Sequence, residues 1–156
     1  MHPAKSVIGF TTASGAGYGL LVWLAIAPYL WPMAVDQSFG IVAFGIAFAL
    51  VVGGLLSSTF HLGHPERAWR AMSQWRSSWL SREGVAAIVT FVPTGLYALY
   101  WVFQGENTGN AGIIGLVGAA LSLITVYCTS MIYGSLKSIP AWHNAATDPA
   151  YLVLSL

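Results

Sequence analysis

The sequence predicts an all-α fold, a polytopic bundle of transmembrane helices that forms a single domain over residues 1–156. Two observations support this prediction. First, 56% of the residues are hydrophobic and only 7% are charged, whereas about 25% of a soluble domain is charged, so lipid must surround most of the chain. Second, the apolar runs are long, without the alternating segments of about ten residues that mark a membrane β-barrel.

Four apolar stretches are each long enough to cross a bilayer core, which takes about 20 helical residues. They cover approximately residues 7–31, 39–60, 84–103 and 111–136. A fifth apolar run begins at Tyr151 and reaches Leu156. We therefore expect four full spans and the start of a fifth, in a chain that is the truncated N-terminal half of a longer protein.

Glycines recur at helix-packing intervals in the first and fourth of these stretches. They are Gly15, Gly17 and Gly19 in the first, and Gly112, Gly115 and Gly118 in the fourth. Such spacing lets two helix backbones approach closely in a membrane. The alternative is that they only reflect the general tolerance of transmembrane helices for glycine.

Charge is distributed unevenly between the two sides of the predicted bundle. The Lys and Arg residues all fall in segments that share one side, namely Lys5, Arg67, Arg70, Arg76, Arg82 and Lys137. The segments on the opposite side carry Asp36 and Glu106. Under the positive-inside rule, this bias places the N-terminus and the connection over residues 62–82 in the cytoplasm.

The connection over residues 62–82 is rich in arginine and tryptophan. Pro65 is suited to the first position of a helix. On a helix, the aromatic and basic residues separate onto two sides, with Trp69, Met72, Trp75 and Trp79 on one and Arg67, Arg70 and Gln74 on the other. This pattern predicts an amphipathic segment in the membrane interface, against anionic lipid headgroups. A positive-inside loop with an aromatic belt is the simpler interpretation.

His61 and Glu83 are the candidates for chemistry. His61 closes the second predicted span and Glu83 opens the third, so both are expected at one membrane depth. An ionisable group there is a functional candidate, because its burial near lipid costs free energy. A histidine can hydrogen-bond a quinone oxygen and exchange a proton, and a carboxylate can accept a second proton. Residue types alone nevertheless favour structural roles, with His61 capping helix-end carbonyls and Glu83 interacting with the helix dipole.

Other classes of site fit the residue types less well. A membrane b-type haem needs histidines within spans, and no histidine falls in the middle of a predicted span. His61 and His64 lack a carboxylate or thiolate to complete a metal site, and the single Cys128 cannot hold an iron–sulfur cluster. The net charge of +1 argues against nucleic-acid binding. Trp142, in a loop on the arginine side, is either a second wall of the same pocket or an interfacial anchor.

Two motifs resemble those of a known family. The first is His61-Leu62-Gly63-His64-Pro65-x-Arg67-Ala68 followed by Trp79-Leu80-Ser81-Arg82-Glu83, and the second is Tyr-x-Ser-Leu-x-Ser-Ile-Pro-x-Trp at residues 133–142. In this order and spacing they are similar to the membrane anchor subunits of dimethyl sulfoxide reductase. The opening Met1-His2-Pro3-Ala4 and the stretch at residues 10–19 look closer to one branch, the anchors of quinone-linked sulfite dehydrogenases that work on the cytoplasmic side.

The resemblance implies an eight-helix subunit of the bacterial inner membrane that carries no haem. Such a subunit exchanges electrons between quinone, either menaquinone or ubiquinone, and an iron–sulfur partner subunit. That partner serves a molybdopterin catalytic subunit, so molybdopterin and the clusters belong to the partners. The family's quinol-site histidine falls on His61 and its glutamate on Glu83, which reverses the preference for structural roles. The resemblance leaves His64, Arg67, Arg82 and Trp142 as candidates for the pocket or for partner docking.

Two alternatives stand beside a quinone-reactive anchor. One is a passive anchor whose loop only holds a catalytic partner. The other is half of a transporter, which is disfavoured because the mid-span positions carry no polar pairs and no clearly broken helix. The branch sets the direction of electron flow, since a reductase anchor oxidises quinol and a sulfite dehydrogenase anchor reduces quinone. The cytoplasmic placement of residues 62–82 agrees with the sulfite branch.

Overall fold

The computed structural model describes residues 5–31, 36–59 and 64–156, and every regular element within these ranges is helical. The elements are α1 (Lys5–Leu30), α2 (Gln37–Thr59), the 3₁₀ helix η1 (Pro65–Gln74), α3 (Trp79–Leu99), the π-helical turn η2 (Tyr100–Gln104), α4 (Gly109–Gly134) and α5 (Thr147–Ser155). Four of the described helices, α1 to α4, are long and apolar enough to cross a membrane. The predicted fold class is thus confirmed.

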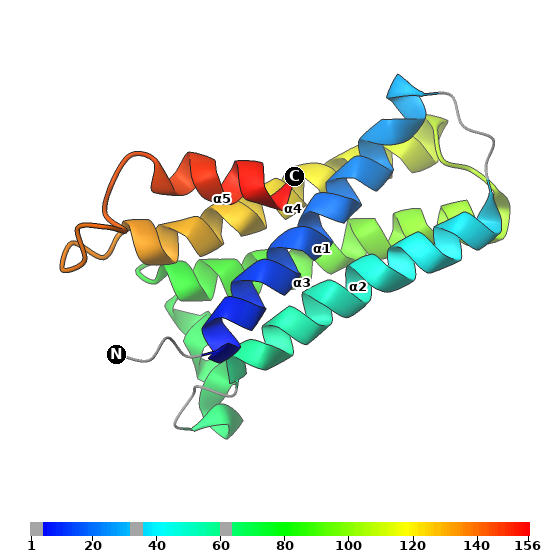
Figure 1. The fold of residues 1–156 in the computed structure, drawn as a ribbon. Helices are drawn as coiled ribbons and strands as arrows, with labels where there is room; N and C mark the ends of the chain where they lie inside the picture. The colour runs from blue at the N-terminus through cyan, green and yellow to red at the C-terminus, as the bar shows by residue number, and fades with distance from the viewer. Residues whose placement is uncertain (1–4, 32–35, 60–63) are drawn as a thin grey trace.

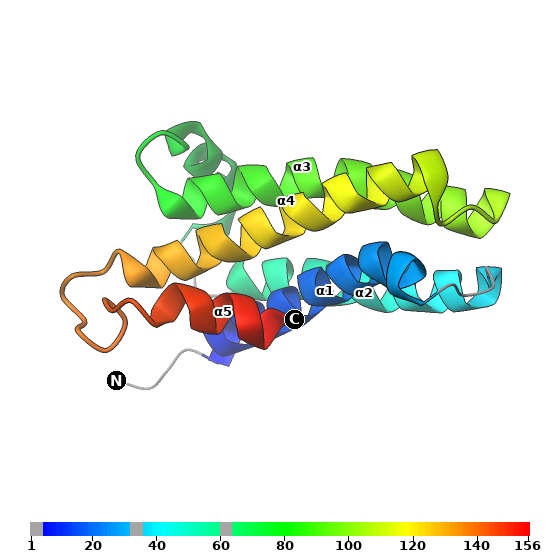
Figure 2. The same cartoon turned by 90° about the horizontal axis from the view of Figure 1, so that it is seen from above.

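The four long helices form two pairs (Figures 1 and 2). α1 packs along α2, α3 packs along α4, and the pairs join mainly through α1 and α4. The short α5 lies against both α4 and α1. An aromatic cluster fills the core between the pairs, where the Phe44 ring meets Tyr97 and Trp101 edge-on at 5.6 and 5.8 Å between ring centroids. Because α5 packs against both α1 and α4, these three helices enclose the residues that lie between them.

The two ends of the bundle differ in charge. The start of α1, η1 and the loop after α4 lie at one end, and the connection between α3 and α4 lies at the other (Figure 1). The first end carries Lys5, the arginines of residues 67–82 and Lys137, while the second carries Asp36 and Glu106. The charge separation predicted from the sequence is therefore present in the fold.

Several glycines lie at helix contacts. A Cβ added at Gly17 of α1 would lie 2.8 Å from a backbone oxygen of α2. One added at Gly118 of α4 would lie 2.7 Å from Cγ2 of Thr94 in α3, and one at Gly115 would lie 2.9 Å from the Tyr97 ring. These separations are shorter than van der Waals contact, so the interpretation of these three glycines as packing residues is confirmed.

α3 begins earlier than the sequence predicts. We expected a loop over residues 62–82, with the span after it, but the helix begins at Trp79. Ser78 has extended backbone, and its side chain accepts a hydrogen bond from the Ser81 N–H at 3.4 Å, which caps the helix. The expectation that Glu83 opens the span was therefore wrong. Glu83 lies one turn inside α3, because the cap recruits the preceding polar residues into the helix.

The amphipathic segment is a 3₁₀ helix rather than an α-helix. Pro65 occupies its start, as predicted. Three residues per turn place Trp69, Met72 and Trp75 on one side, and all three are exposed. Trp79 was expected on the same side but belongs to α3 and is half-buried. The predicted grouping therefore holds for the three residues that precede α3.

Candidate functional site

Glu83 is a carboxyl group enclosed by the helix bundle. It lies one turn inside α3, and only 4% of its surface is exposed. Acidic side chains are rarely buried to this degree without a partner, because the charged form loses its hydration. Thr129 of α4 is such a partner, since its Oγ1 donates to Glu83 Oε1 at 2.5 Å. Burial and this short hydrogen bond make Glu83 the centre of the candidate site.

Thr129 faces two acceptor oxygens. Its Oγ1 lies 2.5 Å from Glu83 Oε1 and 3.1 Å from the backbone oxygen of Thr125. A threonine hydroxyl carries one proton and two lone pairs, so it donates to one of these oxygens at a time. Beside a charged Glu83 it donates to the carboxylate, whereas a protonated Glu83 can donate to Thr129 while Thr129 donates to Thr125. The hydroxyl group can therefore follow either protonation state by rotation alone.

Arg82 makes its contacts with the loop before α3. Its Nε donates to the Trp75 carbonyl at 3.0 Å, and Nη2 donates to the Arg76 carbonyl at 2.8 Å. The guanidinium carbon also lies 4.2 Å from the centroid of the Trp79 ring, within cation–π distance. Sequence reasoning suggested Arg82 for the pocket or for partner docking. In the structure it ties the turn after η1 to the first turn of α3.

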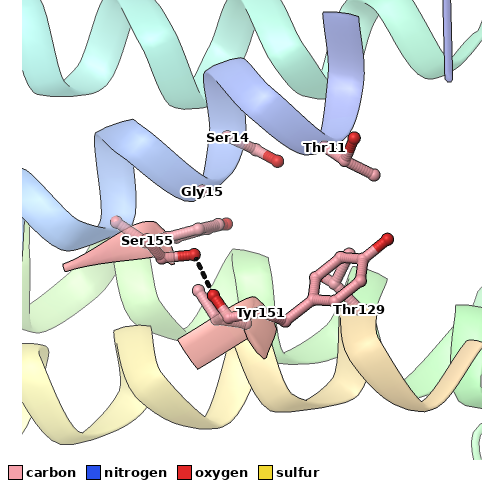
Figure 3. A pocket seen from close by; sticks show the side chains of 8 residues that line it. Thr11, Ser14, Gly15, Thr129, Tyr151 and Ser155 are labelled. Carbon is pink, nitrogen blue, oxygen red and sulfur yellow. Dashed lines mark hydrogen bonds between the residues drawn. The ribbon is translucent and has the colours of Figure 1, made fainter. Parts of the chain in front are cut away.

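A small pocket lies between α1, α4 and α5 (Figure 3). Its lining residues are Thr11, Ser14, Gly15, Tyr18, Val126, Thr129, Tyr151 and Ser155. Six of them carry hydroxyl groups, although membrane-spanning helices form two of its walls. The cavity measures about 10 Å³, which is close to the space that one water molecule needs. Thr129 belongs both to this pocket and to the pair with Glu83, so the two are neighbours.

Tyr18 of α1 lines the pocket and has a buried hydroxyl group that is unpaired within the described part of the chain. The side chain is 2% exposed, and its Oη has no hydrogen-bond partner among the described residues. Most buried hydroxyl groups are paired, because an unpaired one costs about 1–3 kcal/mol. The Tyr18 hydroxyl also lies within electrostatic range of Glu83. The pocket therefore contains an unmet hydrogen bond close to the buried carboxyl group.

Aromatic rings connect the loop after α4 with this pocket. Trp142 packs edge-on against Tyr133 at 5.2 Å between ring centroids, and Tyr133 stacks on Tyr151 at 5.6 Å. Tyr151 in turn lines the pocket. Trp142, which sequence reasoning suggested as a wall of the site, is thus linked to the pocket through two intervening tyrosines.

Comparison with known protein families decides what kind of protein carries this site. The family model described as the DMSO reductase anchor subunit (DmsC) matches residues 1–156, which is the whole chain. The chain belongs to the DmsC family. The resemblance drawn from the two sequence motifs is therefore confirmed, and the four candidate spans are those of a membrane anchor subunit.

Three curated relatives show how far the similarity extends within the DmsC family. A sulfite dehydrogenase subunit from Allochromatium vinosum is 36% identical over 170 residues, covering 99% of this chain and 52% of that protein. A subunit of the anaerobic dimethyl sulfoxide reductase from Haemophilus influenzae is 29% identical over 103 residues, covering 66% of this chain and 37% of that protein. A subunit of the anaerobic dimethyl sulfoxide reductase from Escherichia coli is 22% identical over 145 residues, covering 92% of this chain and 50% of that protein. The chain spans about half the length, or less, of these relatives. No solved structure gives a significant match.

The structure brings only some of the predicted site residues of this DmsC-family chain into view. Glu83 is buried at the centre of the site, while His61 lies outside the described residues. His64 is exposed directly before η1. Arg67 lies in η1, and its side chain is also outside the described part of the chain. The pairing of His61 with Glu83 therefore stays a prediction.

Sequence reasoning missed Tyr18, Thr129 and Tyr151. A signal for Thr129 was present, because Ser122, Thr125 and Thr129 recur at intervals of three and four residues and so share one side of α4. All three are buried. Tyr18 lies in the middle of α1 and Tyr151 lies in α5, and sequence reasoning assigned a role to neither.

Proposed function

We propose that this chain is the membrane anchor and quinone-reactive electron-transfer subunit of a molybdopterin oxidoreductase complex. An iron–sulfur subunit and a molybdopterin catalytic subunit would carry the other redox centres. The sulfite dehydrogenase subunit from Allochromatium vinosum matches nearly the whole chain, which favours sulfite as the substrate of the catalytic partner. Electrons would then pass from sulfite through the partners to membrane quinone.

The observation that carries this proposal is the enclosed pair of Glu83 and Thr129. An ionisable side chain within a membrane span is a functional candidate, because its burial near lipid is costly. The pair lies toward the end of the bundle that carries η1, where Cγ of Met72 lies 3.7 Å from a Cβ built on Gly84. A quinone ring arriving from the bilayer could meet the carboxyl group at this end.

Quinone would supply two-electron chemistry that is coupled to proton transfer. Glu83 would give or take a proton at its carboxyl group, while Thr129 keeps that group oriented. His61, which is known here from its motif alone, would hydrogen-bond a quinone oxygen. The pocket beside Thr129 has room for about one water molecule and is too small for a quinone ring. We therefore propose that the ring approaches Glu83 from elsewhere, at the end of α3 against which η1 packs.

The charged end of the bundle supports a proposal for the orientation of the subunit and for the docking of its partner. The N-terminus and η1 would lie in the cytoplasm, because the basic residues gather there. The exposed face of η1 and the turn after it would dock the iron–sulfur partner, with Arg70 lying over Trp69 at 5.4 Å and Arg76 over Trp75 at 5.6 Å, from guanidinium carbon to ring centroid. In these contacts, the arginine cations and the tryptophan rings form one exposed surface that a partner could bind.

Replacing Glu83 tests the proposal in the full-length complex. Glu83→Gln should reduce sulfite-dependent reduction of menadione by about 100-fold or more, the scale of losing a proton-transfer group. Turnover with a soluble dye that takes electrons from the catalytic partner should stay normal, which shows that assembly is intact. Glu106→Gln makes the same change at an exposed position on the opposite end and should retain full activity. Normal menadione reduction by Glu83→Gln would instead favour a passive anchor.

A further inference from the structure

Several hydroxyl groups of the pocket lining have oxygens that can still accept a hydrogen bond. Three of them, on Thr11, Ser14 and Ser155, donate to carbonyl oxygens one turn earlier in their own helices, at 3.1, 2.6 and 2.7 Å. Each hydroxyl uses its single proton in this hydrogen bond. Its oxygen keeps lone pairs that can accept a further hydrogen bond. Figure 3 shows these side chains around the same small space. The pocket therefore suits a ligand that donates hydrogen bonds.

Tyr18 supplies the complementary donor. Tyr18 lines the pocket, and its Oη has no partner among the residues that the structure describes. A water molecule can accept from Tyr18 and donate to two of the surrounding oxygens, which removes the cost of leaving this hydroxyl unpaired. A cavity of about 10 Å³ admits about one such molecule and excludes larger ligands.

Thr129 joins this position to Glu83. Thr129 lines the pocket, and its hydroxyl group donates to the carboxyl oxygen of Glu83 at 2.5 Å. Among the described residues, the other titratable groups within electrostatic range of this carboxyl are Tyr18 from α1, Cys128 and Tyr133 from α4, and Tyr151 from α5, with Arg82 as its neighbour in α3. Phenol and thiol groups are weak acids near pH 7. Among these groups, the carboxyl of Glu83 is the one suited to exchange a proton there.

We propose that the pocket binds one water molecule and that Glu83 exchanges its proton with the cytoplasm through Thr129 and this water. The proposal rests on the proposed quinone function, which requires Glu83 to give or take protons. The route adds the pocket between α1, α4 and α5 to the proposed quinone site at Glu83. Thr11, half-buried near the start of α1, forms the rim of the pocket toward the end assigned to the cytoplasm.

The transfer is balanced in protons and moves no electrons. In the direction away from the quinone, the O–H bond of the Glu83 carboxyl breaks and the proton joins Thr129 Oγ1. The proton of Thr129 passes to the water, which releases a proton at the rim beside Thr11. Quinone reduction uses the same transfers in reverse, so that a proton from the water reaches Glu83.

Variants that delete single hydroxyl groups test this route in membrane vesicles that contain the full-length complex. Thr129→Val should leave KM for menadione within about twofold, lower kcat about tenfold and raise the solvent deuterium isotope effect, because proton delivery becomes rate-limiting. Thr129→Ser keeps the hydroxyl and should restore kcat. Tyr18→Phe should lower kcat in the same direction but less strongly. Thr125→Val, the matched substitution one turn earlier in α4, should behave as the wild type.

Infrared difference spectroscopy adds a readout that does not depend on turnover. The C=O band of the Glu83 carboxyl, identified by its absence in Glu83→Gln, should move to higher frequency in Thr129→Val because it loses a hydrogen bond. A water O–H band that shifts in ¹⁸O-labelled water should be present in the wild type and absent in Tyr18→Phe.

The outcomes separate this route from the quinone function on which it rests. If Glu83→Gln abolishes menadione reduction while Thr129→Val and Tyr18→Phe keep wild-type kcat and isotope effects, the route is wrong and the quinone function stands. The route is also wrong if Thr125→Val lowers kcat as much as Thr129→Val, since helix packing would then explain the loss. If Glu83→Gln reduces menadione normally, the quinone function fails and the route fails with it.

Discussion

Thr129 of α4 donates a hydrogen bond to the buried carboxyl group of Glu83 in α3, with 2.5 Å between Oγ1 and Oε1. A second pair of hydroxyl groups, Thr90 and Thr125, joins the same two helices at 3.1 Å. Polar contacts between helices in a membrane contribute about 0.6 kcal/mol on average, so neither contact alone holds the pair together. Their effect is positional, because they fix which side of α3 faces α4 and keep Glu83 inside the bundle.

The first prediction concerns the packing that keeps α3 against α4. Gly115→Ala adds a Cβ 2.9 Å from the Tyr97 ring, and this ring is only 1% exposed and has little room to move. We expect a loss of about 1–3 kcal/mol in stability, the usual cost of overpacking. Thermal unfolding of the full-length protein in detergent, followed by circular dichroism, should show a lower Tm.

Gly95→Ala is the matched control for this prediction. No atom lies within 4 Å of a Cβ built on Gly95 among the described residues, and alanine favours a helix interior more than glycine does. Its Tm should equal or slightly exceed that of the wild type. Equal Tm values for Gly115→Ala and Gly95→Ala would contradict the close approach of α3 and α4.

The second prediction concerns the loop between η1 and α3. Arg82→Gln removes the hydrogen bonds to the Trp75 and Arg76 carbonyls and the stacking on Trp79. The turn should then open more often, and chymotrypsin should cleave after Trp75 severalfold faster. Lys137→Gln, at an exposed position on the same end, should leave that rate unchanged. An unchanged rate in Arg82→Gln would show that the arginine does not restrain the turn.

The third prediction concerns orientation in the membrane. Gln74 and Glu106 are both exposed and lie at opposite ends of the bundle. In a Cys128→Ala background, a cysteine placed at Glu106 should react with a membrane-impermeant maleimide in intact cells. A cysteine at Gln74 should react only after the membrane is opened, because the basic end lies in the cytoplasm. The reverse labelling pattern would overturn the proposed orientation.

The sequence was sufficient to predict the spans but not all of their ends. A bilayer requires long apolar helices, so the hydropathy along the sequence locates four of them, most of their ends to within a few residues. The start of α3 was missed because it depends on a cap, in which the Ser78 side chain accepts from Ser81, and not on hydropathy. A hydropathy pattern assigns polar residues such as Glu83 to a loop, although in this structure they belong to a helix.

Sequence reasoning found one residue of the candidate site, the one that carries charge, and overlooked the weaker signal that the spacing of Thr129 with Ser122 and Thr125 provides. Glu83 stands out because a carboxyl group is rare in such an apolar chain. Its partner Thr129 is 46 positions away, and Tyr18 comes from another helix pair, so their proximity depends on which helices are neighbours. Hydrophobic patterns do not encode that α1 packs against α4, because every face of these helices is apolar enough for lipid.

The last prediction concerns the coupling between Thr129 and Glu83. If Thr129 acts through the carboxyl group, then Thr129→Val should lower kcat about tenfold in the wild type but leave it unchanged in a Glu83→Gln background. The glutamine keeps the oxygen that accepts from Thr129, so the double variant should fold as well as Glu83→Gln. Residues in direct contact show such non-additive effects, whereas independent residues have effects that multiply.

The measurement for this coupling is menadione-linked kcat of the two single variants, the double variant and the wild type. A parallel set with Thr125→Val in place of Thr129→Val provides the comparison, because Thr125 lies one turn away and contacts Thr90 rather than Glu83. Multiplicative losses for the Thr129 set would mean that the hydroxyl group acts by packing alone. Equal kcat in Glu83→Gln with and without Thr129→Val would instead assign the whole effect of this hydroxyl to the buried carboxyl group.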